Sequence, residues 1–258
     1  MTCRVTTSTD GDCFQRKNGG GRFATNVIIM LTTWLGDIGR ERFFADHFQQ
    51  APFAQPATAR SAIPFLRWRT IEAVMASGAD MLVVRDAKLR REPSPENFYD
   101  ALALFNDGWS LVFRRCEKHE PGLRALADSF AAELEGDVSI QLYLTPANHH
   151  SFSWHYDCED VFIAQTGGVK EYYLRRNTVN PEPTLDAMPK DMHYEQETTP
   201  TIASTLITGD CLYIPRGWWH VARALEDSLS ISVGVLSPAA ATRKGAQLAA
   251  SSAPNRQP

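Results

Sequence analysis

Residues 155–170 read His-Tyr-Asp-Cys-Glu-Asp-Val-Phe-Ile-Ala-Gln-Thr-Gly-Gly-Val-Lys, and the prediction of the fold starts from this stretch. The run from Val161 to Gln165 predicts a short β-strand, and Lys170 begins a second strand after the turn residues. Further short strands are predicted on both sides, at residues 138–144, 153–157, 206–207, 212–214 and 229–235. Short strands separated by turn residues predict a β-barrel or a double-sheet jelly roll.

The strand at 138–144 alternates between apolar and polar residues. Its apolar side chains share one face and its polar side chains share the other, the two sets being Val138, Ile140, Leu142 and Leu144, and Ser139, Gln141 and Tyr143. A strand of this kind is typical of a sheet that lines a cavity.

Before residue 136 the apolar residues repeat at helical spacing instead. Helices are predicted from Leu31, from Phe43, from Trp68 to Gly78, and from Leu123 to Gly136, with strands at 81–85 and 109–115. A further helix is predicted to begin at Ser94, with serine as N-cap and Pro95 at the first helical position, and to end at Gly108. We therefore expect an α+β protein with four regions: a disordered N-terminal segment (1–22), a helical preface with flanking strands (23–135), a barrel (136–236) and a disordered tail (237–258).

The composition is that of an ordinary globular protein, with 258 residues, 43% hydrophobic and 22% charged. A formal charge of −4 argues against a broad nucleic-acid-binding surface. No apolar run has the length of a membrane span, and no signal peptide is recognised. The five cysteines are odd in number and lack Cys-x-x-Cys spacing, so neither a disulfide framework nor a zinc site is indicated. We expect a cytoplasmic protein with reduced thiols.

His155 and Asp157 are predicted to bind one metal ion, because residues two apart on a strand point to the same face. His220, which follows Gly217-Trp218-Trp219, is the best candidate for a third ligand. Two imidazoles and one carboxylate form the facial triad found in non-haem Fe(II) oxygenases, which leaves coordination positions open for a cosubstrate and dioxygen. His149, His150 and His193 compete for the third place, but His149 and His150 stand in a loop and are expected to face substrate or solvent.

Taken together, these motifs resemble the JmjC and cupin-type 2-oxoglutarate oxygenases. The resemblance is nearest to the branch of the ribosomal oxygenases and the asparaginyl hydroxylase that acts on hypoxia-inducible factor. It is carried by His-Tyr-Asp at 155–157, Phe-x-Ala-Gln at 162–165, Gly-x-Lys at 168–170, Gln-Leu-Tyr-Leu-Thr-Pro at 141–146, and the run from Gly209 to His220. It implies a double-stranded β-helix (jelly-roll or cupin) barrel with an N-terminal helical preface packed on it.

The resemblance also implies roles for single residues. Fe(II) would bind His155, Asp157 and His220, and Lys170 would hold the distal carboxylate of 2-oxoglutarate, which needs a cationic partner when it is buried. Gln141 stands where the ribosomal oxygenases carry an asparagine near the metal and cosubstrate, and Val161 stands where the hypoxia-factor hydroxylase has an asparagine. Two further residues are expected to contact the cosubstrate, namely Tyr143 and either Ser230 or Ser232, of which we select Ser232.

The leading functional hypothesis is a dioxygenase that uses Fe(II), 2-oxoglutarate and dioxygen to hydroxylate an amino-acid side chain in a protein or peptide. Asp157 favours hydroxylation over halogenation, because a halide site would need glycine or alanine in its place. Three alternatives stay open: a tailoring hydroxylase of a free or carrier-bound amino acid or peptide natural product, a non-catalytic cupin that binds a metal or small ligand, and an N-methyl demethylase. The partner is thus a protein, a peptide or an amino-acid-like small molecule, and the sequence leaves the oligomeric state open.

Overall fold

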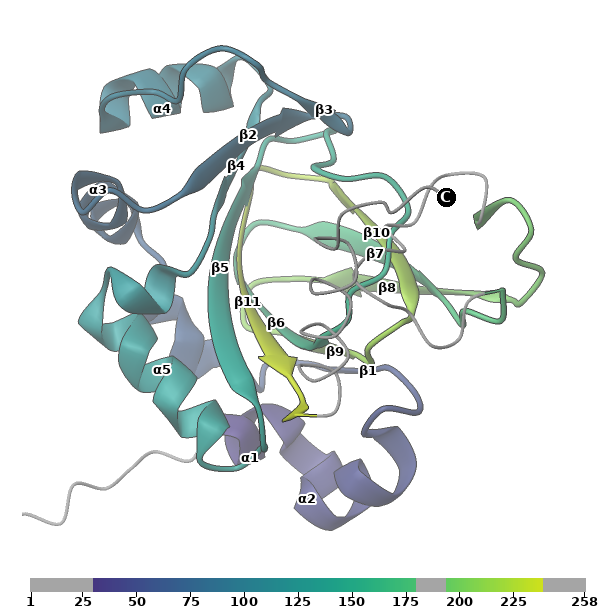
Figure 1. Cartoon of the computed structure of the whole chain (residues 1–258). Helices are drawn as coiled ribbons and strands as arrows, with labels where there is room; N and C mark the ends of the chain where they lie inside the picture. The colour runs from purple at the N-terminus through teal and green to yellow at the C-terminus, as the bar shows by residue number, and fades with distance from the viewer. Residues whose placement is uncertain (1–29, 180–193, 239–258) are drawn as a thin grey trace, which may run out of the picture.

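The computed structural model describes residues 30–179 and 194–238 (Figure 1). The predicted disordered segment at 1–22 and the tail from residue 239 onward lie outside these residues, as does His193. Within them, helices cover one face of a large antiparallel sheet, and a small sheet faces its other side (Figure 1). The predicted α+β jelly-roll architecture is thereby confirmed.

The large sheet has eight strands in the order β1-β9-β6-β11-β5-β4-β2-β3. The long strands β5 (Asp137–Thr145), β6 (Asp160–Gly167) and β11 (Ser228–Leu236) form its centre. The flanking strands are shorter, and comprise β1 (Phe53–Gln55), β2 (Met81–Arg85), β3 (Lys88–Leu89), β4 (Ser110–Phe113) and β9 (Cys211–Ile214). Strand β11 pairs with both β5 and β6, so it lies in the middle of the wall that bounds the pocket described below.

The small sheet has three strands in the order β10-β7-β8, namely β10 (Trp219–Ala224), β7 (Lys170–Arg175) and β8 (Thr201–Leu206). The chain passes from β6 in the large sheet to β7 in the small sheet through a turn at Gly168. Gly168 has φ +66°, and a Cβ atom there would lie 2.0 Å from the carbonyl oxygen of Asp227. This turn therefore requires glycine, and it sets where Lys170 enters the small sheet.

The helices precede the barrel strands in the chain. The α-helices are α1 (Met30–Leu35), α2 (Gly39–Arg42), α3 (Trp68–Ala76), α4 (Phe98–Asn106) and α5 (Pro121–Ala131). Shorter turns of 3-10 helix are η1 (Gly36–Ile38), η3 (Arg60–Phe65) and η4 (Cys116–Lys118), and η2 (Phe43–His47) is a π-helical turn. Helix α5 lies along the outer face of the large sheet (Figure 1), and the side chain of Glu120 caps its first turn by accepting from the Leu123 N–H.

One hydrophobic core joins the helices to the large sheet. It contains Trp34 and Phe43 from the first helical turns, Phe130 from α5 and Phe162 from β6, all fully buried. The rings contact one another edge-on or tilted, with centroids 5.2 Å apart for Trp34–Phe130 and for Phe130–Phe162. The apolar face of β5 packs into this core through Ile140, Leu142 and Leu144, as the alternating pattern predicts.

Two predictions of local structure are wrong. Helix α4 begins at Phe98 rather than near Pro95, because Asn97 is its N-cap and its side chain accepts from the Asp100 N–H. Residues 153–157 form no strand, since His155 makes only a single β-bridge, to His220. The prediction assigned a strand so that His155 and Asp157 would point to the same face, but the single bridge to His220 is enough to orient His155.

None of the helices within the described ranges combines the length and the apolar character that crossing a lipid bilayer requires.

Candidate metal centre

His155 and His220 are held opposite each other by their own main chains. The N–H of His155 donates to the carbonyl of His220 (3.1 Å), and the N–H of His220 donates to the carbonyl of His155 (2.7 Å). This pair forms the antiparallel bridge at the start of β10. Because paired residues of a bridge project to the same side, the two imidazoles meet, with ring centroids 4.1 Å apart.

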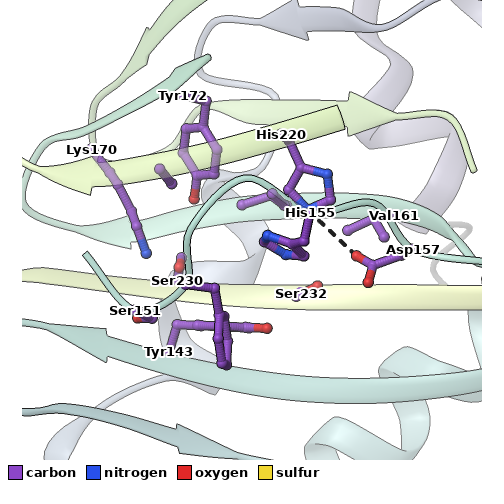
Figure 2. Close-up of a pocket in the computed structure, with 13 residues that line it drawn as sticks. Tyr143, Ser151, His155, Asp157, Val161, Lys170, Tyr172, His220, Ser230 and Ser232 are labelled. Atoms are coloured by element: carbon purple, nitrogen blue, oxygen red, sulfur yellow. Dashed lines mark ion pairs between the residues drawn. The ribbon is translucent and has the colours of Figure 1, made fainter. Parts of the chain in front are cut away.

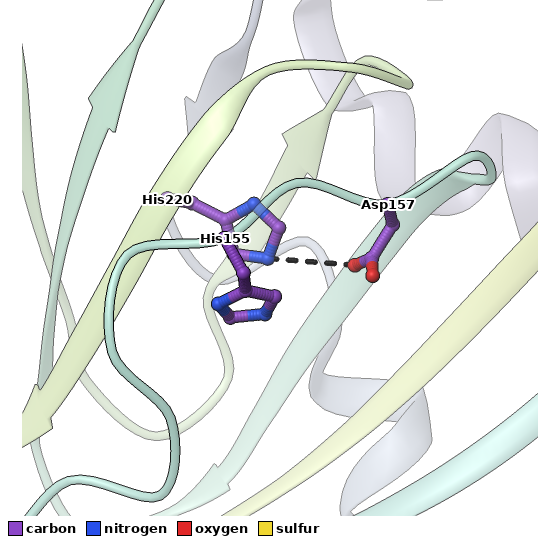
Figure 3. Close-up of side chains that lie close together, drawn as sticks. All are labelled: His155, Asp157 and His220. Carbon is purple, nitrogen blue, oxygen red and sulfur yellow. Dashed lines mark ion pairs between the residues drawn. The ribbon is translucent and has the colours of Figure 1, made fainter. Parts of the chain in front are cut away.

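Asp157 is brought to the same place by the turn before β10. The Gly217 N–H donates to the Asp157 carbonyl at 2.8 Å, which ties the segment after His155 to the segment before His220. The Asp157 carboxylate Oδ2 then lies 3.4 Å from Nε2 of His220 (Figure 3). One ligand atom from each of the three residues lies within 4.8 Å of the other two.

Both imidazoles are oriented by a backbone carbonyl. Nδ1 of His155 donates to the carbonyl of Ser153 at 2.7 Å, and Nδ1 of His220 donates to the carbonyl of Trp218 at 3.0 Å. A carbonyl oxygen can only accept a hydrogen bond, so each Nδ1 carries a proton. Each Nε2 is then the ring nitrogen that can coordinate a metal ion. This is the outer hydrogen bonding that metal-binding histidines ordinarily have.

The protonation states also suit a metal ion. Burial lowers the pKa of His155 to about 4, and the neighbouring charge of His220 adds to the effect, so this imidazole is neutral at pH 7. Burial alone would raise the pKa of Asp157, but the hydrogen bond and charge of His220 outweigh it and lower that pKa to about 2. The pKa of His220 is raised, because the interaction with Asp157 outweighs the effect of burial. A divalent cation would displace that proton and be held by both partners.

The residues present therefore fit a divalent metal of the iron type. Two imidazole nitrogens and one carboxylate oxygen lie on one side of a pocket, which is the donor set of the facial triad. The predicted set of His155, Asp157 and His220 is thus brought together by the structure, and its assignment as a metal site remains a proposal.

The three residues open onto a pocket between the two sheets (Figure 2). Lys170 lies in the wall of this pocket, and its side chain points into it (Figure 2). Lys170 is 4% exposed, and its ammonium donates to the hydroxyl of Thr145 at 3.1 Å. No ion pair to Lys170 occurs within the described residues, and burial lowers its pKa to about 8. A buried cation without an anionic partner marks a place where an anionic ligand can bind.

Polar residues of β5 and β11 stand opposite one another beside the pocket. Ser230 stands opposite Tyr143, and Ser232 opposite Gln141. Tyr143, Ser230 and Ser232 line the pocket, whereas Gln141 does not. Gln141 is one step removed, because its side-chain oxygen accepts from the hydroxyl of Tyr143 at 3.0 Å. Of the residues predicted to contact the cosubstrate, the structure places Lys170, Tyr143 and Ser232 in the pocket wall and Gln141 outside it.

Sequence reasoning missed several residues of this pocket, among them Tyr172 and Ser151. Tyr172 shares a face of β7 with Lys170, so the two-residue period would have found it. The same period places Thr145 on the face of β5 that carries Tyr143, and Thr145 accepts from the Lys170 ammonium without itself lining the pocket. The ring of Tyr172 lies 5.8 Å from the Lys170 ammonium. Ser151 also lines the pocket, and it comes from a loop where no periodic pattern indicates orientation.

The competing histidines occupy a different place. Nδ1 of His149 and Nδ1 of His150 each lie 3.2 Å from the carboxylate of Asp86 in the β2–β3 turn. Main-chain hydrogen bonds from Asp86 and Ala87 to the carbonyls of His150 and Ser151 fasten the same loop. These two histidines therefore hold the loop that leads to the pocket, rather than joining His155 and His220.

Comparison with protein families matches residues 121–242 to the JmjC domain. The matched range begins with α5 and includes every strand of the small sheet, so it contains the triad and Lys170.

Curated relatives are similar over about half of this chain. A bifunctional lysine-specific demethylase and histidyl-hydroxylase NO66 from Dictyostelium discoideum is 30% identical over 135 residues, which are 51% of this chain and 26% of that protein. The protein of the same description from Drosophila melanogaster is 29% identical over 130 residues, 50% of this chain and 20% of the relative. The match thus spans between 15% and 26% of the length of these curated relatives.

Solved structures share the fold. The X-ray structure of Escherichia coli ycfD has a TM-score of 0.61 at 23% identity, covering 84% of this chain and 61% of that one. A structure of YcfD, described as a ribosomal oxygenase, in complex with cobalt and 2-oxoglutarate has a TM-score of 0.57 at 24% identity, covering 84% and 60%. The double-sheet barrel and the matched range together show that residues 121–242 of this chain, a little under half of it, are similar to the JmjC domain.

Proposed function

We propose that this protein is an Fe(II)- and 2-oxoglutarate-dependent dioxygenase that hydroxylates an amino-acid side chain in a protein or peptide. The observation that carries the proposal is the placement of His155, Asp157 and His220 in one pocket with the buried ammonium of Lys170. A metal site alone would suit many proteins. A metal site beside an unpaired buried cation suits a ligand that chelates a metal at one end and carries a carboxylate at the other.

In this proposal His155, Asp157 and His220 would hold Fe(II), and Lys170 would hold 2-oxoglutarate in the same pocket. Bound together with dioxygen, Fe(II) and 2-oxoglutarate supply the oxidising power for C–H hydroxylation, coupled to conversion of 2-oxoglutarate into succinate and carbon dioxide. Lys170 binds and orients the far carboxylate, and the hydroxyl of Thr145 fixes the ammonium that does so. Burial raises the pKa values of Tyr143 and Tyr172, so both phenols stay protonated at neutral pH.

The proposed substrate class is supported by the relatives rather than by a residue of this chain. The curated relatives are described as histidyl-hydroxylases and YcfD as a ribosomal oxygenase. Gln141, which is linked to Tyr143, also lines a separate surface groove with Arg114 and Glu159. A groove that begins beside the metal pocket is the kind of surface along which a peptide could lie.

The test is an incubation of the protein with Fe(II), ascorbate, 2-oxoglutarate and peptides from a cell extract. We expect succinate to form and a peptide to gain the mass of about one oxygen atom. Asp157→Ala should abolish both signals, whereas Trp68→Ala, at a surface position remote in sequence from the triad, should retain them. Metal binding without formation of succinate from 2-oxoglutarate in the presence of any peptide would leave a non-catalytic metal-binding cupin as the better description.

Demethylation is a second candidate, because the curated relatives are described as lysine-specific demethylases as well as hydroxylases. The same pocket could oxidise an N-methyl carbon. Intact mass separates the two reactions, since hydroxylation adds one oxygen atom and demethylation removes one methylene group.

We also propose a cytoplasmic location. Cys116, Cys158 and Cys211 form no disulfide within the described residues, as expected of a reducing compartment. A fusion to a redox-insensitive fluorescent protein, followed by fractionation, tests this placement.

A further inference from the structure

The turn at residues 215–218, which contacts two of the candidate metal ligands, is itself hydrogen-bonded to one buried carboxylate. Asp160 is the first residue of β6 and is 1% exposed. Its side chain accepts three hydrogen bonds: from the Tyr213 hydroxyl at 2.5 Å, from Gln49 Nε2 at 3.2 Å and from the Arg216 N–H at 3.4 Å. These donors come from β9, from the loop after η2 and from the turn before β10, so one side chain joins three separate parts of the fold.

All three neighbours are donors, and Asp160 has only acceptors when it is ionised. The Tyr213 oxygen is itself occupied, because it accepts from the main-chain N–H of Gln49 at 2.9 Å. The direction of each hydrogen bond is therefore fixed. Burial raises the pKa of Asp160, and the hydrogen bonds from Tyr213, Gln49 and Arg216 oppose this effect.

The Arg216 N–H belongs to the turn from Pro215 to Trp218, and this turn contacts the candidate ligands directly. Its Gly217 N–H binds the carbonyl of Asp157, and its Trp218 carbonyl accepts from Nδ1 of His220. The same turn thus fixes the main chain at one ligand and the ring orientation of another. The carboxylate that holds the turn acts on both.

We propose that Asp160 is a positioning residue of the metal centre, and that through Gln49 it makes the helical preface part of that centre. The proposal rests on the proposed function, in that His155, Asp157 and His220 bind the metal. Gln49 has φ +59°, an uncommon conformation for a residue other than glycine, and this conformation lets both its main-chain N–H and its side chain reach the Asp160–Tyr213 pair.

The test compares Asp160→Ala with Asp160→Asn and with a matched control, Glu117→Ala. Glu117 is also a buried carboxylate, 5% exposed, and it accepts from the main-chain N–H of Ile140 in β5, away from the turn at 215–218. Mn(II) affinity is measured by the electron paramagnetic resonance signal of free Mn(II), and Co(II) absorption reports the coordination geometry. Both readouts are independent of turnover.

We expect Asp160→Ala to weaken Mn(II) binding by about 10–100-fold, the usual effect of losing an outer partner of a metal site, and to change the Co(II) spectrum. Asp160→Asn should restore most of the affinity, because its amide oxygen can still accept from Arg216 while the Gln49 amide turns to accept from its NH₂. Glu117→Ala should lower the unfolding temperature and leave Mn(II) affinity within about threefold of the wild type. Should Asp160→Ala fail to fold, Tyr213→Phe removes one donor and should weaken Mn(II) binding in the same direction.

Wild-type affinity in Asp160→Ala, or in Tyr213→Phe where that variant replaces it, would overturn the positioning role, and so would an equal loss in Glu117→Ala. Absence of Mn(II) binding by the wild type would instead overturn the proposed function and this proposal with it. The two failures are therefore told apart by the wild-type titration alone.

Discussion

Lys170 shows at the scale of a single residue how a ligand site can cost the free protein stability. Its ammonium is buried with one neutral partner, Thr145, so its charge is only partly compensated until an anion binds. The buried charge lowers the stability of the free protein and strengthens the binding of an anion. Replacing Lys170 with the similarly shaped, uncharged methionine measures both effects, one on the free protein and one on the complex.

We expect Lys170→Met to stabilise the protein without 2-oxoglutarate and to weaken 2-oxoglutarate binding by about 100-fold or more, since an uncompensated buried charge costs about 3–5 kcal/mol. Titration calorimetry on Mn(II)-loaded protein and thermal unfolding without ligand measure the two effects. Thr145→Val is the control, and it should weaken binding only about fivefold because it removes one neutral hydrogen bond. Unchanged 2-oxoglutarate affinity in Lys170→Met would place the cosubstrate elsewhere.

The pH dependence of stability should carry the same signature. The folded-state pKa of Lys170 is about 8, below its ordinary value of 10.5, so the unfolded chain binds more protons between these two values. The destabilisation of the folded protein by the Lys170 charge is therefore fully present below about pH 8, and it is relieved as the pH rises towards 10.5. The free energy of unfolding of Lys170→Met minus that of the wild type should shrink by about 3 kcal/mol across this range. Denaturant titrations at half-unit pH steps measure it, and a constant difference would contradict the prediction.

Sequence reasoning placed single residues well wherever a short spacing fixes a shared face. Tyr143 and Lys170 lie in the pocket wall as predicted, and the alternating pattern of β5 predicts its buried face. Gln141 shares that polar face but does not line the pocket, and its side chain contacts Tyr143 instead. The pattern predicts the side of a strand, whereas the reach of the cavity along the strand depends on how far apart the two sheets stand.

At the scale of the element, turns decide what strands alone leave open. The predicted strand at 153–157 is absent. A single bridge to His220 and the turn at 215–218 position His155 and Asp157 instead. Such contacts join residues far apart in sequence, so no local pattern can indicate them. The start of α4 was misplaced for a different reason: Ser94-Pro95 and Asn97 both provide start signals, and Asn97 is the residue whose side chain accepts from the Asp100 N–H.

Gly168 tests how far one turn controls the pocket. Alanine there would bring its Cβ within 2.0 Å of the Asp227 carbonyl oxygen at φ +66°, whereas Gly78 has φ +77° with no atom within 4 Å. Gly78→Ala should cost about 1–2 kcal/mol for the backbone conformation alone, and Gly168→Ala should cost clearly more. Urea unfolding measures the stability. Only Gly168→Ala should also weaken 2-oxoglutarate binding, because the turn leads into Lys170; equal effects of both substitutions on binding would contradict this account.

At the scale of the whole molecule, the predicted boundary between a preface at 23–135 and a barrel at 136–236 divides regions that share one core. Phe43 from the preface contacts Phe162 and Tyr213 of the barrel, with ring centroids 5.8 Å and 5.2 Å apart. Composition and periodicity could indicate two kinds of secondary structure. They could not show that the two pack through the same aromatic cluster, because that is a property of the assembled fold.

We therefore expect the protein to unfold in one step, and Phe43→Ala to lower the free energy of unfolding by about 3–5 kcal/mol. Far-ultraviolet circular dichroism and tryptophan fluorescence should give coincident transitions in both wild type and variant. Tyr99→Ala is the matched aromatic control, since Tyr99 is 79% exposed, and it should change stability by at most about 0.5 kcal/mol. Two separated transitions would show that the preface and barrel are independent folding units.

The main-chain bridge between His155 and His220 has a consequence for how this protein can evolve. Peptide groups, which every residue possesses, hold the two segments together, so mutation of either imidazole leaves the bridge in place. A homologue that lost these metal-binding histidines would keep the fold and the pocket between the two sheets. Selection for folding alone would not remove such inert copies, and they could survive as decoys that capture the partner without altering it.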